Sequence, residues 1–143
     1  MIRLNRVNED NFNQVIDLKK GTDVADFVDE PIYSLAEAFL YKDSSECFVI
    51  CKDDSVIGFI SIYFGEENCQ IINFLVDKDF QGRGYGSEAA RLCIDYFVNN
   101  FSPKRISLPV HVDNVRAQKF WEKLGFEKSE TKEDGYVFMR LYL

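Results

Sequence analysis

The sequence is poor in the residues that build metal centres. It contains one histidine, His111, and four cysteines, none of which forms a Cys-x-x-Cys pair. Structural zinc sites use four Cys or His ligands at short spacings, so no metal is expected. Cys47 and Cys51 flank a strand-like run and are typical of small buried apolar side chains. Free thiols of this kind agree with a reducing compartment.

Long apolar runs and excess basic charge are also lacking. No stretch approaches the roughly 20 apolar residues that a membrane helix needs, and residues 1–5 lack a signal-peptide h-region. We therefore expect a cytoplasmic protein with no membrane partner. Lys and Arg number 17 against 24 Asp and Glu, and the resulting net charge of -7 argues against nucleic acid as a partner.

Apolar residues are plentiful. They make up 46% of the 143 residues, and 13 of them are phenylalanine, which is ample material for a core. This length suits one compact domain, so residues 1–143 are interpreted as a single domain.

Apolar periodicity predicts an alternation of strands and helices. Helices are expected from Asn8 or Asp10 to about Lys19 and over residues 34–42, 87–99 and 114–124. The second begins at a capping box, Ser34-Leu35-Ala36-Glu37. Strands are expected over residues 2–7, 47–52, 56–63, 70–76, 105–110, 126–128 and 136–143. Hairpins precede helical crossovers, which favours an α/β (α+β) fold with one central mixed, mostly antiparallel sheet and helices on both faces.

Residues 71–87 carry the most informative pattern. A buried strand runs into a glycine-rich turn, and the turn opens a helix. Backbone N–H groups at such a helix start are unpaired and lie at the positive end of the helix dipole, which favours a phosphate or pyrophosphate. Arg83 adds a positive charge. A glycine-rich turn can also be structural only, so the turn alone leaves both interpretations open.

Two familiar phosphate motifs do not fit this turn. A P-loop ends in Gly-Lys-Ser/Thr, whereas Gly86 is followed by Ser87 and Glu88. The dinucleotide fingerprint requires G-x-G-x-x-G, and here the three glycines are spaced by two.

The pattern that fits is Q-x-x-G-x-G, formed by Gln81, Gly84 and Gly86. It resembles the coenzyme A pyrophosphate loop of the GNAT N-acetyltransferase superfamily. A second segment about 30 residues downstream is similar to that superfamily's Asn-x-x-Ala, aromatic, Glu-Lys-x-Gly-Phe motif; its matching residues are Asn114, Ala117, Phe120, Trp121, Glu122, Lys123, Gly125 and Phe126. The order of predicted elements resembles the family from residue 2 to residue 143, which implies a GNAT-like acyl-CoA N-acyltransferase fold.

The resemblance implies acetyl-CoA as co-substrate and a set of residues that bind it. A splayed strand would pair its backbone with the pantetheine arm, loop amides would hold the pyrophosphate, Asn114 would hydrogen-bond the pantetheine arm, and Phe120 would pack against the cofactor. The full implied set is Phe74, Leu75, Val76, Gln81, Gly82, Arg83, Gly84, Tyr85, Gly86, Ser87, Asn114 and Phe120. The side chains of Phe74, Leu75, Val76 and Phe120 also suit plain core packing.

The catalytic acid is not identified. In the family a Tyr four residues after the motif Ala often protonates the leaving thiolate, but this position is Trp121. An indole N–H donates a hydrogen bond and is not a useful proton source. His111, at the end of a predicted strand, is a possible general base, although a polar strand-end role is favoured.

The acceptor is expected to be a primary amine. The segment that lines the acceptor site in the family carries most of the net charge here: residues 22–46 contain Lys42 as the one base and seven acids, Asp23, Asp26, Asp29, Glu30, Glu37, Asp43 and Glu46. Such a cluster attracts polycations, so a polyamine or diamine is the hypothesis, with Asp29, Glu30 and Glu37 as the binding residues. A solvated acidic face is the alternative.

Three other functions fit the same residues: a protein N-terminal or lysine acetyltransferase, a non-catalytic CoA-binding regulatory domain, and a protein-binding module with a purely structural turn. Family members are often homodimers, so a homodimer is a further expectation from the resemblance.

Overall fold

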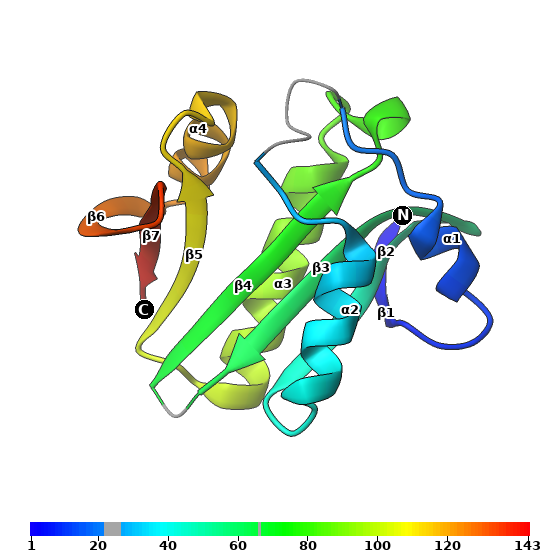
Figure 1. The fold of residues 1–143 in the computed structure, drawn as a ribbon, viewed down its shortest axis with the longest axis horizontal. Helices are drawn as coiled ribbons and strands as arrows, with labels where there is room; N and C mark the ends of the chain where they lie inside the picture. The colour runs from blue at the N-terminus through cyan, green and yellow to red at the C-terminus, as the bar shows by residue number, and fades with distance from the viewer. Residues whose placement is uncertain (22–26, 66) are drawn as a thin grey trace.

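A single seven-stranded sheet organises the chain in the computed structural model, which describes residues 1–21, 27–65 and 67–143 (Figure 1). The strand order is β1-β2-β3-β4-β5-β7-β6. Only β4 and β5 run parallel among the paired strands of the described residues. The strands are β1 (Ile2–Arg6), β2 (Ser45–Lys52), β3 (Ser55–Phe64), β4 (Asn68–Val76), β5 (Arg105–His111), β6 (Glu127–Glu133) and β7 (Tyr136–Tyr142).

Helices cover both faces of this sheet. The helical elements are α1 (Phe12–Ile16), α2 (Pro31–Leu40), the short 3-10 turn η1 (Lys78–Phe80), α3 (Tyr85–Phe101) and α4 (Val115–Lys123). Val15 of α1 and Leu35 of α2 pack on one face with Phe59 and Leu75, whereas α3 buries its apolar stripe on the other face. The predicted mixed, mostly antiparallel sheet between two helical layers is confirmed.

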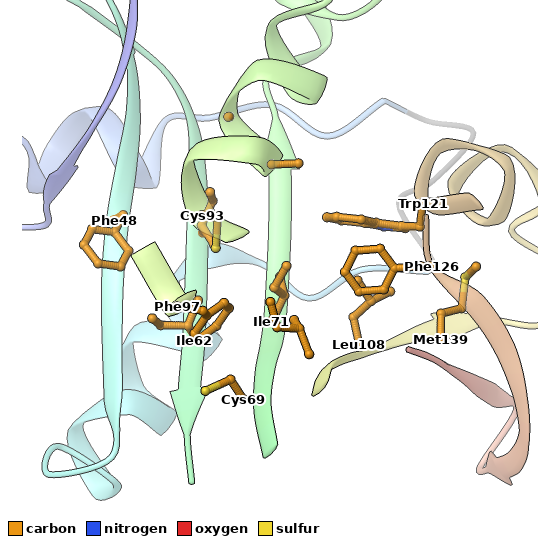
Figure 2. Close-up of a cluster of buried hydrophobic side chains, with 14 of the residues drawn as sticks. Phe48, Ile62, Cys69, Ile71, Cys93, Phe97, Leu108, Trp121, Phe126 and Met139 are labelled. Carbon is orange, nitrogen blue, oxygen red and sulfur yellow. The ribbon is translucent and has the colours of Figure 1, made fainter. Parts of the chain in front are cut away.

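The larger core joins the two halves of the sheet across the parallel strand pair. Figure 2 shows Phe97 of α3 beside Ile62 and Ile71, and Trp121 of α4 above Phe126 and Leu108. Burial of these side chains is the main force that holds β5, β6 and β7 against the first four strands.

The cysteines are free thiols. Cys51, Cys69 and Cys93 are buried, as small apolar residues, and Cys47 is half-buried. Burial raises the pKa of the Cys47 thiol to about 11 and that of Cys93 to about 12.

A β-bulge in β4 changes which way its side chains point. Ser61 and Ile62 of β3 lie opposite Asn73 and Ile71, so Ile72 is the extra residue. Strict alternation would turn Asn73 to the face of Ile71. Asn73 instead faces α2, and its Nδ2 donates to Ser34 Oγ at 3.1 Å.

Strands β4 and β5 separate soon after they meet. Their pairing covers only residues 68–70 of β4 and 105–107 of β5, whereas β4 remains paired with β3 as far as Val76. Figure 1 shows the two strands diverging toward the carboxyl end of β4. On its β5 side, the backbone edge of β4 beyond Gln70 therefore has no strand partner among the described residues.

Two sequence-based boundaries were wrong. The first predicted helix is confined to Phe12–Ile16. The second begins at Pro31 with Glu30 as N-cap, and Ser34 does not cap it because it lies buried inside the helix. Proline is favoured in the first turn because its missing N–H would have no helical partner there.

Among the described residues, no helix is long and apolar enough to cross a membrane. In the same part of the chain, no group of three or more His, Cys, Asp or Glu side chains is arranged to hold a metal ion.

Candidate active site

A cavity of about 330 Å³ lies where β4 and β5 part. We call it the strand-gap cavity. Ten of the twelve residues proposed from the sequence to bind the cofactor line it: Phe74, Leu75, Val76, Gln81, Gly82, Gly84, Gly86, Ser87, Asn114 and Phe120. Arg83 and Tyr85 are not among the lining residues; the Arg83 guanidinium lies 5.8 Å from the Phe80 ring centroid, and Lys52 Nζ lies 5.6 Å from that of Tyr85.

The glycine-rich loop presents unpaired amides at one end of this cavity. The first backbone hydrogen bond of α3 is donated by the amide of Glu88 to the Gly84 carbonyl. In the described part of the chain, the amides of residues 82–87 donate to no protein acceptor. Such an array at the positive end of a 17-residue helix suits an anion.

Glycine is required in this loop for its backbone angles. Gly82 and Gly84 have φ values of 77° and 84°, which L side chains rarely adopt. A Cβ on either would meet nothing within 4 Å, so the space in front of the loop is open. At Gly86 a Cβ would lie 3.4 Å from the Phe120 ring. The lack of a side chain at Gly86 therefore lets the start of α3 approach α4 closely.

Buried polar contacts fix the base of the loop. Asp77 caps η1 by accepting the Asp79 amide through Oδ1 at 2.9 Å, and its Oδ2 accepts the Lys19 amide at 3.0 Å. Gln81 Nε2 donates to the Val76 carbonyl at 2.8 Å. The motif glutamine thus ties the loop to the end of β4.

Asn114 stands at the junction of β5 and α4. Its Oδ1 caps α4 by accepting the Ala117 amide at 3.2 Å, and the residue is buried while it lines the strand-gap cavity. Oδ1 is the acceptor of the cap, and Nδ2 is the donor of the same side chain that remains for a ligand.

A second cavity of about 410 Å³ continues from the first. We call it the acceptor-side cavity. The two share Val28, Phe74, Asn114, Ala117 and Trp121 as walls. Its lining includes two carboxylates, Asp29 and Glu37.

The remaining members of the acidic cluster are arranged differently. Glu30 does not line the acceptor-side cavity; its carboxylate pairs with Lys20 Nζ at 3.0 Å. Asp23 and Asp26 lie outside the described residues.

Residues 12–126 match the model of the acetyltransferase (GNAT) family. The chain belongs to this family. GNAT enzymes transfer an acetyl group from acetyl-CoA to an amine, and this chain is an acetyl-CoA-dependent N-acetyltransferase of that type.

Individual relatives agree with the family assignment. The chain is 28% identical to the uncharacterized N-acetyltransferase YnaD of Bacillus subtilis over 82% of this chain and 74% of that protein. It is 22% identical to a probable spermine N(1)-acetyltransferase of Bacillus subtilis subsp. natto over 88% of each. Its fold is similar to that of the PaiA N-acetyltransferase of Thermoplasma acidophilum in complex with coenzyme A, with a TM-score of 0.77 and 13% identity over 100% of this chain and 99% of that chain.

Trp121, which stands where the resemblance led us to expect a tyrosine, is a core residue that also borders the cavities. It is 5% exposed and makes edge contacts with Phe74, Phe120 and Phe126 at centroid distances of 4.9–5.2 Å. It also lines both cavities. The position is therefore filled for packing by a side chain that is no proton source.

His111 is held in a fixed orientation at the edge of the acceptor-side cavity. Its Nδ1 accepts the Asp113 amide at 3.1 Å, and its ring stacks on Phe27 at 4.7 Å. Because Nδ1 is an acceptor, the neutral imidazole carries its proton on Nε2. This arrangement agrees with a polar strand-end role.

Sequence reasoning did not assign a binding role to three residues that line the strand-gap cavity of this GNAT enzyme. Arg116 and Ala117 line the strand-gap cavity from α4, and Val28 lines both cavities. The cation at position 116 was detectable, since it lies inside the second motif. Val28 carries no sequence signal; in the structure Lys20 Nζ donates to its carbonyl at 2.8 Å.

Proposed function

We propose that this GNAT enzyme acetylates a primary amine of a diamine or polyamine and holds the CoA pyrophosphate on the amides of residues 82–87. One observation carries the part of this proposal that concerns the cofactor. The amides of residues 82–87 have no protein acceptor among the described residues, and the space in front of the loop glycines Gly82 and Gly84 is open. These donors fit a diphosphate in number and charge.

Other chain groups fit the rest of the cofactor. The β4 edge from Phe74 to Val76 has no strand partner on its β5 side among the described residues, and it offers backbone groups to the pantetheine amides in the manner of an added strand. Asn114 Nδ2 supplies a further donor, and Arg116 brings a cation to the same cavity. When bound, acetyl-CoA supplies a thioester carbonyl that a neutral amine attacks, forming a C–N bond and releasing the coenzyme as its thiol.

The acceptor-side cavity favours a cationic amine that must be deprotonated before it reacts. Asp29 and Glu37 attract the ammonium, and the aromatic walls reduce its hydration. A free alkylammonium has a pKa of about 10.4, and desolvation lowers it. A carboxylate of this cavity, directly or through water, accepts the proton that the ammonium loses, and the proton lost after C–N bond formation neutralises the leaving thiolate.

Relatives support a polyamine as acceptor. The probable spermine N(1)-acetyltransferase aligns with 88% of this chain, as does the spermine/spermidine N(1)-acetyltransferase of Bacillus subtilis at 21% identity. A putative [ribosomal protein bS18]-alanine N-acetyltransferase of the same bacterium aligns over 62% of the chain, which keeps a protein N-terminus as the competing acceptor.

The test is a thiol-release assay with acetyl-CoA and a panel of amines. We expect turnover with spermine, spermidine or putrescine at lower KM than with peptides or aminoglycosides. The polyamine assignment is overturned if only peptides or aminoglycosides are acetylated. Failure to bind CoA at all would overturn the cofactor half separately.

A further inference from the structure

A third cavity, of about 260 Å³, lies under α2 on strands β3 and β4. We call it the α2 cavity. It shares Glu37 and Ile72 with the acceptor-side cavity, so the two follow each other along the same sheet face. The bulge residue Ile72 forms an apolar floor between them.

A residue that lines the α2 cavity carries an unpartnered hydroxyl. Ser61 lines it, is 4% exposed, and its Oγ is buried without a hydrogen-bond partner among the described residues. The neighbouring Ser34 Oγ accepts the Asn73 amide. Buried hydroxyls are normally paired, so an unpaired one in a cavity points to a ligand atom or water that completes it.

The lining of the α2 cavity selects the charge of that ligand. Among the described residues, Glu37 is the one charged residue that lines it, and Tyr41, Tyr63 and Gln70 are polar members of the same lining. A carboxylate with neutral oxygen acceptors suits an ammonium, and it disfavours an anion.

We infer that the α2 cavity is a subsite for the distal ammonium of the acceptor, with Glu37 as counter-ion and Ser61 Oγ as hydrogen-bond acceptor. This assignment rests on the proposed polyamine function and adds a length requirement. From Phe74, at the strand-gap cavity, back to Gln70 in the α2 cavity, β4 extends roughly 13 Å at about 3.3 Å per residue. A long polyamine spans this distance with its methylenes over Ile72, whereas a three-carbon diamine does not.

The test compares spermine with 1,3-diaminopropane on three variants. Binding is measured by calorimetry on the protein with CoA, and KM is measured by thiol release. We expect Glu37→Gln to raise the spermine Kd by about tenfold or more, because a charge-assisted bond is lost. Ser61→Ala should raise it about 3- to 10-fold, as expected for one neutral hydrogen bond. In Ser61→Ala the ratio of the spermine Kd to the 1,3-diaminopropane Kd should also rise, because Ser61 lines the α2 cavity and not the acceptor-side cavity.

Asp43→Asn is the matched control. It removes the same charge from the same acidic segment, but Asp43 is exposed and lines none of the three cavities. Its Kd ratio should equal that of the unchanged protein. Ser61→Ala should also fold normally, since it removes an atom on which no described residue depends.

The outcomes separate the two proposals. Polyamine binding and acetylation with an unaltered Kd ratio in Ser61→Ala would overturn the distal subsite and leave the proposed function standing. Absence of any polyamine or diamine binding, with peptides or aminoglycosides acetylated, would overturn both.

Discussion

Replacing Gly84 by alanine tests the anion-binding loop at a single backbone angle. Gly84 is the N-cap of α3 and has φ 84° and ψ -2°. A Cβ there would meet no atom within 4 Å, so the cost of Gly84→Ala is conformational and not steric. An L residue in the left-handed region costs roughly 1–2 kcal/mol.

This cost should appear in CoA affinity. The loop is exposed at its glycines and tied to the fold mainly through Gln81, so the free variant can relax out of the left-handed angle. When CoA binds, the loop must return to the conformation in which its amides point at the diphosphate, and the conformational cost is then subtracted from the binding free energy. We expect the CoA Kd to rise about 5- to 30-fold, since about 1.4 kcal/mol corresponds to a factor of ten. Isothermal titration calorimetry at fixed ionic strength measures it.

Gly125→Ala is the control. Gly125 also has a positive φ, 98°, but it follows α4 and does not line the strand-gap cavity. We expect its Tm to fall by about 3–8 °C with CoA affinity retained. Unchanged CoA affinity in Gly84→Ala, or an equal loss in both variants, would refute the role of the loop.

Three further predictions concern other parts of the site and core. Lys20→Met should raise the KM for amines, because the Val28 carbonyl loses its donor and the cavity wall loosens; a KM equal to that of the unchanged enzyme would contradict this. Trp121→Phe should keep kcat within a few-fold while Tm falls, because the indole packs but supplies no proton; a large loss of kcat at saturating substrates would show a catalytic role. Burial holds the Cys93 thiol neutral to about pH 12 in the folded state, whereas the unfolded thiol ionises near pH 8.5. The free energy of unfolding should therefore fall as pH rises above about 9, and the fall should be shallower in Cys93→Ala when Tm is followed across pH 8–11.

The parts of the fold that sequence reasoning predicted are those set by local patterns. The strands expected over residues 47–52 and 56–63 correspond to β2 and β3, and the helix expected over residues 114–124 corresponds to α4. The unpaired amides of the loop could be predicted from the glycine spacing, because positive φ values and a helix start are set by the local sequence.

The parts it missed depend on tertiary contacts. Ser34 satisfied the capping-box pattern, but burial against Asn73 placed it inside α2. The bulge at Ile72 has no local signature, yet it decides that Asn73 faces α2. Sequence reasoning grouped Glu30 with Asp29 as amine-binding residues, and the ion pair of Glu30 with Lys20 separates their environments.

A titration of the protein with CoA, followed through its backbone amide resonances by nuclear magnetic resonance, tests the central claim most directly. The amides of Gly82, Gly84 and Gly86 should shift strongly as the diphosphate binds, whereas those of Gly125 and Gly135 should stay in place. If CoA binds and the three loop glycines do not move, the loop after Asp77 does not hold the diphosphate.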